Sequence, residues 1–429
     1  MDMKTIDRLA DIHQRAEATL AGNLLPFWFN HGWDEEHGGF LTRMDRCGRR
    51  LDDSEKVLMM QVRMLFSLSA AHRHGLRDRG YLELASETFR FLMDHMWDAV
   101  EGGFYFSVTR DGQPKVARKN TDFHGYALTG LTEYYRASGR QEALDTAERV
   151  FELLMTKAAD RDLGFIEDFD GHDWGALNAE QMNLGSQTRI KTIDMHTNVL
   201  EGFLYLCKST RDPRHLNALR NVLHLIRSKG IHKEHGCTVT VFDYEWNPLT
   251  DVHGRMTTSY GLNVELAWLM LEAVDLLGES REDYRATILG LVDHALDYGL
   301  DRARGGLAAY GPVTGHVVDA VSLSPNRLFK SWWAQAELLN ALIDVYRWTQ
   351  DAKYVNAFIQ QFDWVWTHQI DHECGDWYQD VHWESGEPVT TDKGGEFKTA
   401  FHAGRALIRV SEALQSMILE TAVEPPCSH

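Results

Sequence analysis

The chain has 429 residues, of which 44% are hydrophobic, and 63 acidic against 44 basic side chains give it a net charge of −19. The charge is spread along the chain, without the clusters of Lys and Arg that bind nucleic acids and anionic membranes. This argues against a protein that binds either of them. The first residues, MDMKTIDRLADIH, lack the apolar stretch of a secretion signal, and no window reaches about 18 uninterrupted apolar residues. We therefore expect a cytoplasmic protein with no nucleic-acid or membrane partner.

A glycine-centred segment recurs six times and divides the chain into similar units. The glycines lie at positions 38, 102, 164, 236, 305 and 375, a period of roughly 62–72 residues. Most of these segments alternate apolar and polar residues and turn on Gly, Asp or Asn. This pattern predicts six short β-hairpins.

Helical patterns fill the intervals between the hairpins. Residues 5–33 form the first predicted helix and residues 396–417 the last. Between them the apolar periodicity predicts five helix pairs, at 54–75 and 79–97, 124–139 and 141–155, 195–212 and 213–230, 258–278 and 281–299, and 330–351 and 352–366. The first helix of each pair is apolar on all sides and the second has a wide charged face, which is typical of an inner and an outer ring.

Twelve such helices predict an all-α fold, a toroidal (α/α)6 barrel with short β-hairpins at one rim. A spiral of only two or three units would leave an apolar face exposed, so closure of the ring is favoured. We expect one domain over residues 1–420 and a C-terminal tail at 421–429.

The cysteines are scattered and lack the spacing of a zinc site or a disulfide framework. They are Cys47, Cys207, Cys237, Cys374 and Cys427. We interpret them as reduced thiols of a cytosolic protein.

Aromatic residues crowd the predicted hairpins and the starts of the inner helices, where a funnel should open. Among them are Trp33, Tyr105, Tyr244, Trp246, Tyr310, Trp332, Trp333, Trp377 and Trp383. Aromatic rings with interleaved carboxylates and Arg suit sugars, whose C–H faces are apolar and whose edges carry hydroxyl groups. Packing of hairpins onto helices would account for any single one of them equally well.

Several longer segments carry a resemblance to a known family. They are QVRMLFSLSAAHR with Arg63, KTIDMHTNVLEGFLYL with Glu201, SYGLNVELAWLMLEA with Glu265, KSWWAQAELLNAL with Trp332 and Glu337, and GDWYQDVHWESGEP with Trp377. Together they resemble the N-acylglucosamine 2-epimerase superfamily, particularly its cellobiose 2-epimerase and mannose isomerase branch. The similarity extends from LLPFWFNHGWDEEHGGF to FKTAFHAGRAL. It implies a small-molecule carbohydrate as partner and no metal or other cofactor, and we expect the outer helices to allow a homodimer.

The resemblance also implies proton transfer beside the carbonyl of an opened aldose that is mannose-, glucose- or cellobiose-like. A histidine removes the C2 proton to form a cis-enediolate; return to C2 gives the epimer and return to C1 gives the ketose. Histidine suits both steps because its pKa lies near neutral pH. We expect His402 to be the main base, with His196 and Glu265 completing the catalytic set and Arg63 holding sugar oxygens.

Two positions depart from the histidines that the resemblance implies. Leu262 follows Ser-Tyr-Gly, and Asn198 precedes Val-Leu-Glu, with His196 two residues earlier. Two residues rotate by about 200° around a helix, so His196 replaces the missing imidazole only if the helix shifts. Epimerisation at C2 needs an acid or base on each face, whereas isomerisation can use one base. The sequence therefore favours isomerisation.

Two carboxylates at positions where the family resemblance implies other residues support an alternative to isomerisation. Asp194 stands where the family has Asn, and Asp122 and His124 lie in an early inner-helix motif. Paired carboxylates can cleave glycosidic bonds, so a glycoside hydrolase or lyase is the second hypothesis and a non-catalytic sugar-binding relative the third. Helix N-capping would explain both aspartates structurally. The predicted substrate-binding residues are Arg63, Asp122, His124, Asp194, Asn198, Trp332, Trp333 and Trp377.

Overall fold

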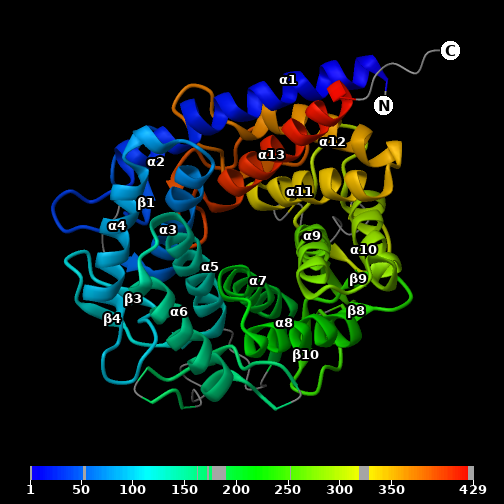
Figure 1. The fold of residues 1–429 in the computed structure, drawn as a ribbon. Coiled ribbons are helices and arrows are strands. Elements are labelled where there is room, and N and C mark those ends of the chain that lie inside the picture. The colour runs from blue at the N-terminus through cyan, green and yellow to red at the C-terminus, as the bar shows by residue number, and fades with distance from the viewer. Residues whose placement is uncertain are drawn as a thin grey trace.

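The computed structural model describes residues 2–51, 55–161, 163–171, 173–175, 190–251, 253–317 and 328–423. Twelve helices in these ranges form two concentric rings (Figure 1). The inner helices are α3 (Leu58–Arg73), α5 (Thr121–Ser138), α7 (Ile193–Thr210), α9 (Tyr260–Leu277), α11 (Trp332–Thr349) and α13 (Phe401–Val423). The outer helices are α1 (Met3–Thr19), which continues through a π turn into α2 (Leu25–His31), α4 (Tyr81–Phe91), α6 (Gln141–Leu153), α8 (Pro213–Leu225), α10 (Arg281–His294) and α12 (Ala352–Trp364). The predicted (α/α)6 toroid is confirmed.

The ring closes between the two ends of the chain. Each inner helix contacts the next one, and α13 contacts both α11 and α3. The outer partner of α13 is α1, so the N-terminal and C-terminal helices lie side by side (Figure 1). Because neighbouring helices cover most of each inner helix, its sequence is largely apolar except where it faces the axis, whereas an outer helix is amphipathic.

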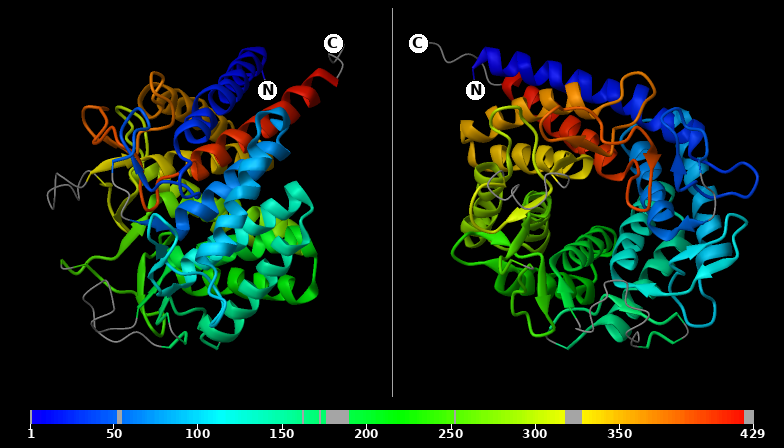
Figure 2. Two further views of the ribbon diagram at one scale, coloured as in Figure 1. Left: turned by 90° about the vertical axis from the view of Figure 1, so that its left-hand side faces the viewer. Right: turned by 180° about the vertical axis from the view of Figure 1, so that it is seen from behind.

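Short strands gather at one end of the ring, opposite the helix bodies (Figure 2, left). They are β1 (Arg43–Met44), β2 (Lys56–Val57), β3 (Ser107–Val108), β4 (Pro114–Val116), β5 (Lys119–Asn120), β6 (Asp168–Phe169), β7 (Ile190–Thr192), β8 (Ile231–His232), β9 (Cys237–Thr238), β10 (Val241–Asp243), β11 (Thr257–Ser259), β12 (Tyr310–Pro312), β13 (Phe329–Ser331), β14 (Asp380–His382) and β15 (Lys393–Gly394).

The pairing of these strands differs from the six local hairpins that we predicted. In most units the strand before an inner helix pairs with the strand that follows the outer helix: β7 pairs with β10, β13 with β14, and β1 with β15 across the ring closure. Five of the glycine turns close through single bridges, such as Trp33 with Phe40, whereas the turn at Gly236 forms the predicted local hairpin, in which β8 pairs with β9. Local alternation predicts that a segment is extended but does not identify its partner.

A buried ion pair recurs at the base of the rim loops. Lys119, two residues before α5, lies with its Nζ 2.8 Å from Oδ2 of Asp98 in the preceding loop. Gly102 donates its N–H to the Asp98 carbonyl and closes the same turn. The equivalent pairs are Lys56–Asp34, Lys191–Asp160 and Lys330–Asp301. Each pair joins a rim loop to the start of the next inner helix.

Breaking one of these pairs should be costly. We expect Lys119→Met to lower the free energy of unfolding by about 3–5 kcal/mol, because it leaves the Asp98 carboxylate buried without a counter-charge. Urea unfolding measures the change. The double variant Asp98→Asn/Lys119→Met should recover most of the loss. A single-variant cost below about 1 kcal/mol, in the range of exposed pairs, would contradict this expectation.

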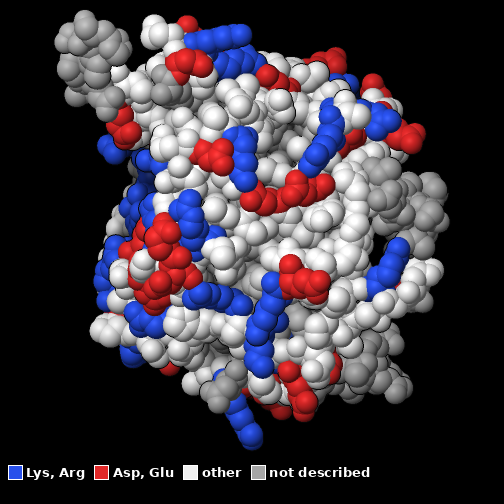
Figure 3. Space-filling model, turned by 90° about the vertical axis from the view of Figure 1, so that its right-hand side faces the viewer, with Lys and Arg blue, Asp and Glu red and all other residues white. Residues whose placement is uncertain are grey.

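The surface agrees with the prediction of evenly spread charge. Acidic and basic side chains are interspersed over the face shown in Figure 3. None of the helices in the described ranges has both the length and the apolar character that crossing a membrane requires. Helix α13 reaches Val423 and so extends into the predicted tail, whose residues 424–429 lie outside the described ranges.

Candidate active site

The second and sixth residues of two inner helices face the axis of the ring. An α-helix turns by about 100° per residue, so residues four apart lie on one face. These positions carry Asp122 and Tyr126 in α5, and Asp194 and Asn198 in α7. All four line a cavity of about 580 Å³ where the rim loops meet the inner helices. Arg63, Glu265, Trp332, Trp333 and His402 also line it.

The fourth residue of an inner helix points away from the axis and holds a rim loop. The N–H of Phe165 donates to Nε2 of His196 at 3.1 Å, and Nδ1 of this ring lies 2.7 Å from the carbonyl oxygen of Thr192. His124 makes the same two contacts in α5, with the Phe104 N–H at 2.9 Å and the Asn120 carbonyl at 2.6 Å. We call such a side chain, which accepts a backbone N–H from a rim loop, a clamp. In three other inner helices the clamps are Gln61, Asn263 and Gln335, which accept from the N–H groups of Phe40, Thr238 and Leu307.

His124 and His196 therefore differ from our expectation that they belong to the site. Neither is among the residues that line the 580 Å³ cavity, and the backbone engages both nitrogens of each ring. Burial lowers the pKa of His124 to about 4 and that of His196 to about 3. Helix α7 begins at Ile193 without a shift, so the 200° rotation of about two residues keeps His196 off the axis. We leave both histidines out of the proposed chemistry.

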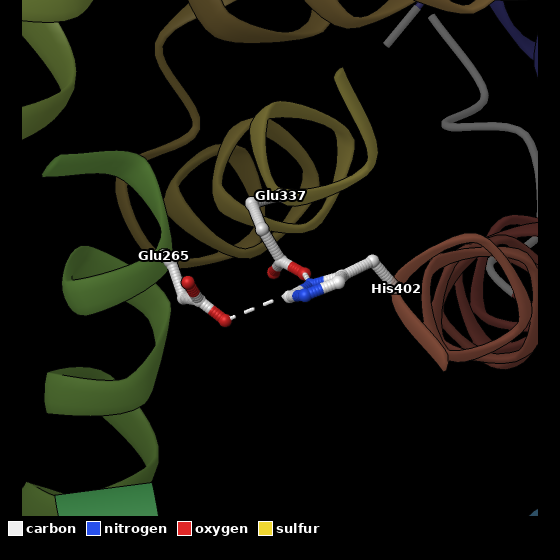
Figure 4. A group of neighbouring side chains, drawn as sticks. All are labelled: Glu265, Glu337 and His402. Carbon is white, nitrogen blue, oxygen red and sulfur yellow. Dashed lines mark hydrogen bonds and ion pairs between the residues drawn. The ribbon is translucent and has the colours of Figure 1, made fainter. Parts of the chain in front are cut away.

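His402 is buried in the first turn of α13 and lines the cavity. Its Nδ1 lies 2.6 Å from Oε1 of Glu337 and 3.9 Å from Oε1 of Glu265 (Figure 4). An ionised carboxylate only accepts hydrogen bonds, so we assign the ring proton to Nδ1 and the lone pair to Nε2. Burial lowers the pKa of His402 to about 3, which keeps the imidazole neutral at neutral pH. Such a ring can take up a proton through Nε2.

Arg405 lies one turn after His402 and donates hydrogen bonds to three buried glutamates. Its guanidinium binds Glu201 and donates to Oε1 of Glu265 and of Glu337, each at 2.8 Å. Burial opposes ionisation of Glu337, but Arg405 and His402 hold the pKa of this carboxyl well below its usual range. Burial and the neighbouring Glu337 raise the pKa of Glu265 well above its usual range, which favours the protonated form of this carboxyl.

The donor atoms of Glu265, Glu337 and His402 lie within 4.8 Å of one another, as in a metal site. Arg405 already brings a positive charge to both carboxylates. A divalent cation at the same place would be repelled by this guanidinium. The group therefore fits its guanidinium better than a metal ion.

Asp122 and Asp194 approach each other across Asn198. The Asn198 Nδ2 donates to Oδ1 of Asp122 at 2.6 Å and to Oδ1 of Asp194 at 3.2 Å. The N-caps of the two helices are Asn120 and Thr192, so capping does not explain the aspartates. Burial and the charge of Asp194 raise the pKa of Asp122 well above its usual range, and burial also raises the pKa of Asp194. Both shifts favour a proton shared by the two carboxyls.

This protonation should be visible in the pH dependence of stability. A carboxyl whose pKa is raised by folding stabilises the protein below the unfolded pKa of about 4, and this contribution is lost as pH rises through the raised value. We expect Asp122→Asn, which needs no proton, to unfold about 1–3 °C above the parent protein at pH 8 and at nearly the same temperature at pH 5. Thermal unfolding checks this, with the exposed Asp275→Asn as control. Parallel pH curves for parent and Asp122→Asn would contradict the shared proton.

The three tryptophans predicted to bind substrate lie in two different places in the structure. Trp332 and Trp333 lie beside His402, with ring centroids 6.3 and 6.1 Å from the imidazole. Trp377 is fully buried and forms a β-bridge with Ile370, outside the cavity lining. Its expected role in substrate binding has no geometric support.

Sequence reasoning missed three residues of the site. Tyr126 supports Arg63, whose Cζ lies 4.1 Å from its ring centroid. Glu337 and Arg405 hold the His402 ring and its neighbours. Tyr126 and Glu337 share the sixth helix position with Arg63, Asn198 and Glu265, and this register would have found them.

A toroid whose axial cavity holds a neutral imidazole, carboxyls with raised pKa and two indole rings has groups suited to moving protons on a polar small molecule. The chain belongs to the N-acylglucosamine 2-epimerase (GlcNAc 2-epimerase) family, which it matches over residues 38–406. Its relatives are sugar epimerases and isomerases.

The similar proteins span nearly the whole chain. Cellobiose 2-epimerase from Bacteroides fragilis is 26% identical over 401 residues, which cover 93% of this chain and 98% of that protein. The structure of cellobiose 2-epimerase from Bacillus thermoamylovorans B4167 matches with a TM-score of 0.83 and 26% identity, covering 94% of this chain and 99% of the other. A D-mannose isomerase structure shares the fold, with a TM-score of 0.79, 19% identity and coverage of 93% and 97%.

Proposed function

We propose that the protein is a sugar isomerase that interconverts a mannose-, glucose- or cellobiose-like reducing-end aldose with its ketose. The observation that carries this proposal is the arrangement around His402, a neutral imidazole fixed by Glu337 at the cavity wall. Among the cavity-lining residues in the described ranges, His402 is the one imidazole. Asn198 lies in the cavity where the family resemblance implies another. One base favours transfer between C1 and C2 on one face of the sugar.

The side chains suggest a role for each step. Nε2 of His402 takes the C2 proton of the opened sugar, and the Glu337 carboxylate stabilises the imidazolium that forms. Arg63 and Glu265, whose raised pKa favours the protonated form, bind the sugar oxygens on which negative charge develops. Return of the proton from Nε2 to C1, with the hydroxyl proton of O2 passing to O1, gives the ketose. Trp332 and Trp333 beside the ring limit the access of water to the transferred proton.

The Asp122–Asp194 pair supports a second candidate function. Both carboxyls line the cavity, and burial raises the pKa of each, which favours one proton on the pair. One protonated and one ionised carboxyl are what glycoside cleavage requires. In that case Asp122 would protonate the leaving oxygen and Asp194 would act as base or nucleophile. A sugar-binding protein without turnover is the third candidate.

One experiment separates these candidates. The protein is incubated in D2O with mannose, glucose, fructose or cellobiose, and the products are followed by NMR. We expect aldose and ketose to interconvert, with deuterium entering C1 or C2 where the base exchanges with solvent. Formation of the C2 epimer alone would require a second proton-transfer group and overturn the one-base assignment. Release of glucose from cellobiose would favour hydrolysis, and no change in any sugar would leave binding alone.

A further inference from the structure

Two cysteines from distant parts of the sequence meet where the ring closes. Cys47 lies in the turn after β1, and Cys374 lies in the glycine turn after α12. Their Sγ atoms are 2.9 Å apart, although 327 positions separate them in the sequence. Cys47 is exposed and Cys374 is half-buried, so small reagents can reach the pair. The prediction of scattered thiols did not anticipate this contact.

Charged side chains hold the two turns against each other. Arg46, next to Cys47, donates from Nε and Nη2 to the two carboxylate oxygens of Asp371 at 2.8 and 2.9 Å. Nη2 also donates to the hydroxyl of Tyr378 at 3.1 Å. The same Asp371 carboxylate accepts the N–H of Cys374 at 3.1 Å. The bidentate pair therefore fixes the backbone on both sides of the two sulfur atoms.

We propose that Cys47 and Cys374 form a thiol–disulfide site, which reacts with a low-molecular-weight disulfide and closes the ring covalently. The other described cysteines do not compete. Cys207 and Cys237 are fully buried, and burial raises the pKa of each thiol to about 12. A buried thiol with a high pKa is a poor nucleophile.

Oxidised glutathione serves as the representative oxidant. The hydrogen bond with Cys47 raises the pKa of Cys374 to about 11, which makes Cys374 a poor first nucleophile, and the exposed Cys47 is the thiol that meets the oxidant first. Its thiolate bonds to one glutathione sulfur and displaces the other as glutathione thiolate. Cys374 then loses its proton to solvent, attacks the Cys47 sulfur and displaces the second glutathione. Two protein thiols and one oxidised glutathione thus give one protein disulfide and two reduced glutathiones, with two electrons passing to glutathione.

The crosslink would join the first and last units of the toroid, which otherwise associate through packing and ion pairs. It restrains the unfolded chain across 327 positions. We expect the oxidised protein to unfold roughly 3–6 °C above the reduced protein. The place where the first and last units meet also borders the cavity, because the paired residues Arg43 of β1 and Gly394 of β15 both line the cavity.

The test uses the full chain with Cys427→Ser throughout, because Cys427 lies outside the described residues. The protein is incubated with oxidised glutathione and then analysed by thiol counting, non-reducing peptide mapping and thermal unfolding. We expect the loss of two thiols, a linked Cys47–Cys374 peptide within one chain, and a rise in Tm that reductant reverses. Cys47→Ser and Cys374→Ser should show neither the linked peptide nor the rise.

Other outcomes would overturn the proposal. One such outcome is a mixed disulfide in which glutathione stays on Cys47 while Cys374 remains a free thiol. The other is a disulfide that forms only between two chains. A linked peptide without any change in Tm would exclude a role in holding the ring closed. None of these readouts depends on sugar turnover, so this test stands apart from the proposed enzymatic function.

Discussion

Replacing His402 with Asn should lower kcat for sugar isomerisation by about 10²–10⁴-fold, while the protein stays folded and still binds sugar. Asn can keep a hydrogen bond to Glu337 but has no nitrogen that takes a proton from carbon. Steady-state kinetics with the sugar identified by NMR measures the loss, and calorimetry measures binding. Full turnover by His402→Asn would end the assignment of this residue as the base.

A matched control comes from the other inner helices. His196 holds the same helix position as Asn263, which already clamps a rim loop through its side-chain oxygen. We expect His196→Asn to lower Tm but to leave kcat within about threefold of the parent, since this ring does not line the cavity. A loss of kcat in His196→Asn equal to that in His402→Asn, without unfolding, would mean that His196 reaches the substrate.

The Arg405→Met variant should show the largest loss of stability, at least about 3–5 kcal/mol of unfolding free energy. Met fills a similar volume but leaves Glu201, Glu265 and Glu337 buried without their shared cation. Chemical denaturation measures the change, and acidic pH should restore part of it by protonating the glutamates.

Two comparisons calibrate the Arg405 result. The exposed pair of Arg281 with Asp275 is the control, and Arg281→Met should cost no more than about 1 kcal/mol. Adding Glu201→Gln to Arg405→Met should recover part of the lost stability. Arg405 is the cation that donates a hydrogen bond to Glu201 among the described residues, and Gln carries no charge that needs such a partner. If Arg405→Met were as stable as Arg281→Met, the three glutamates would not depend on the guanidinium.

The ring was predictable because its signal repeats. Six glycine turns and alternating apolar and amphipathic helices occur at a regular spacing, and each unit supports the same interpretation. The cavity was partly predictable for the same reason. Arg63, Glu265 and His402 were expected from the family resemblance, and all three line the cavity. Arg405 could have been found as the residue three positions after His402 on the same helix face.

What the sequence did not reveal depends on helix phase and on long-range contacts. A histidine on an inner helix faces either the axis or a rim loop, and the residue at which the helix begins decides which of the two it faces. Because the sequence does not fix that residue, we expected His124 and His196 at the axis, whereas both contact rim loops. The meeting of Cys47 with Cys374 arises only when the ring closes. No local pattern identifies partners so far apart.

Clamp positions and axial positions alternate within the first turns of the inner helices, and this arrangement affects how the sequence can change during evolution. Residues that hold the rim loops and residues that line the cavity occupy different faces of the same helix turn, so we expect a mutation at one kind of position to leave the other largely in place. New chemistry can therefore be acquired one side chain at a time on an unchanged scaffold. Asn198 is a natural place to try this by design, because an imidazole installed there would enter the cavity without releasing a rim loop.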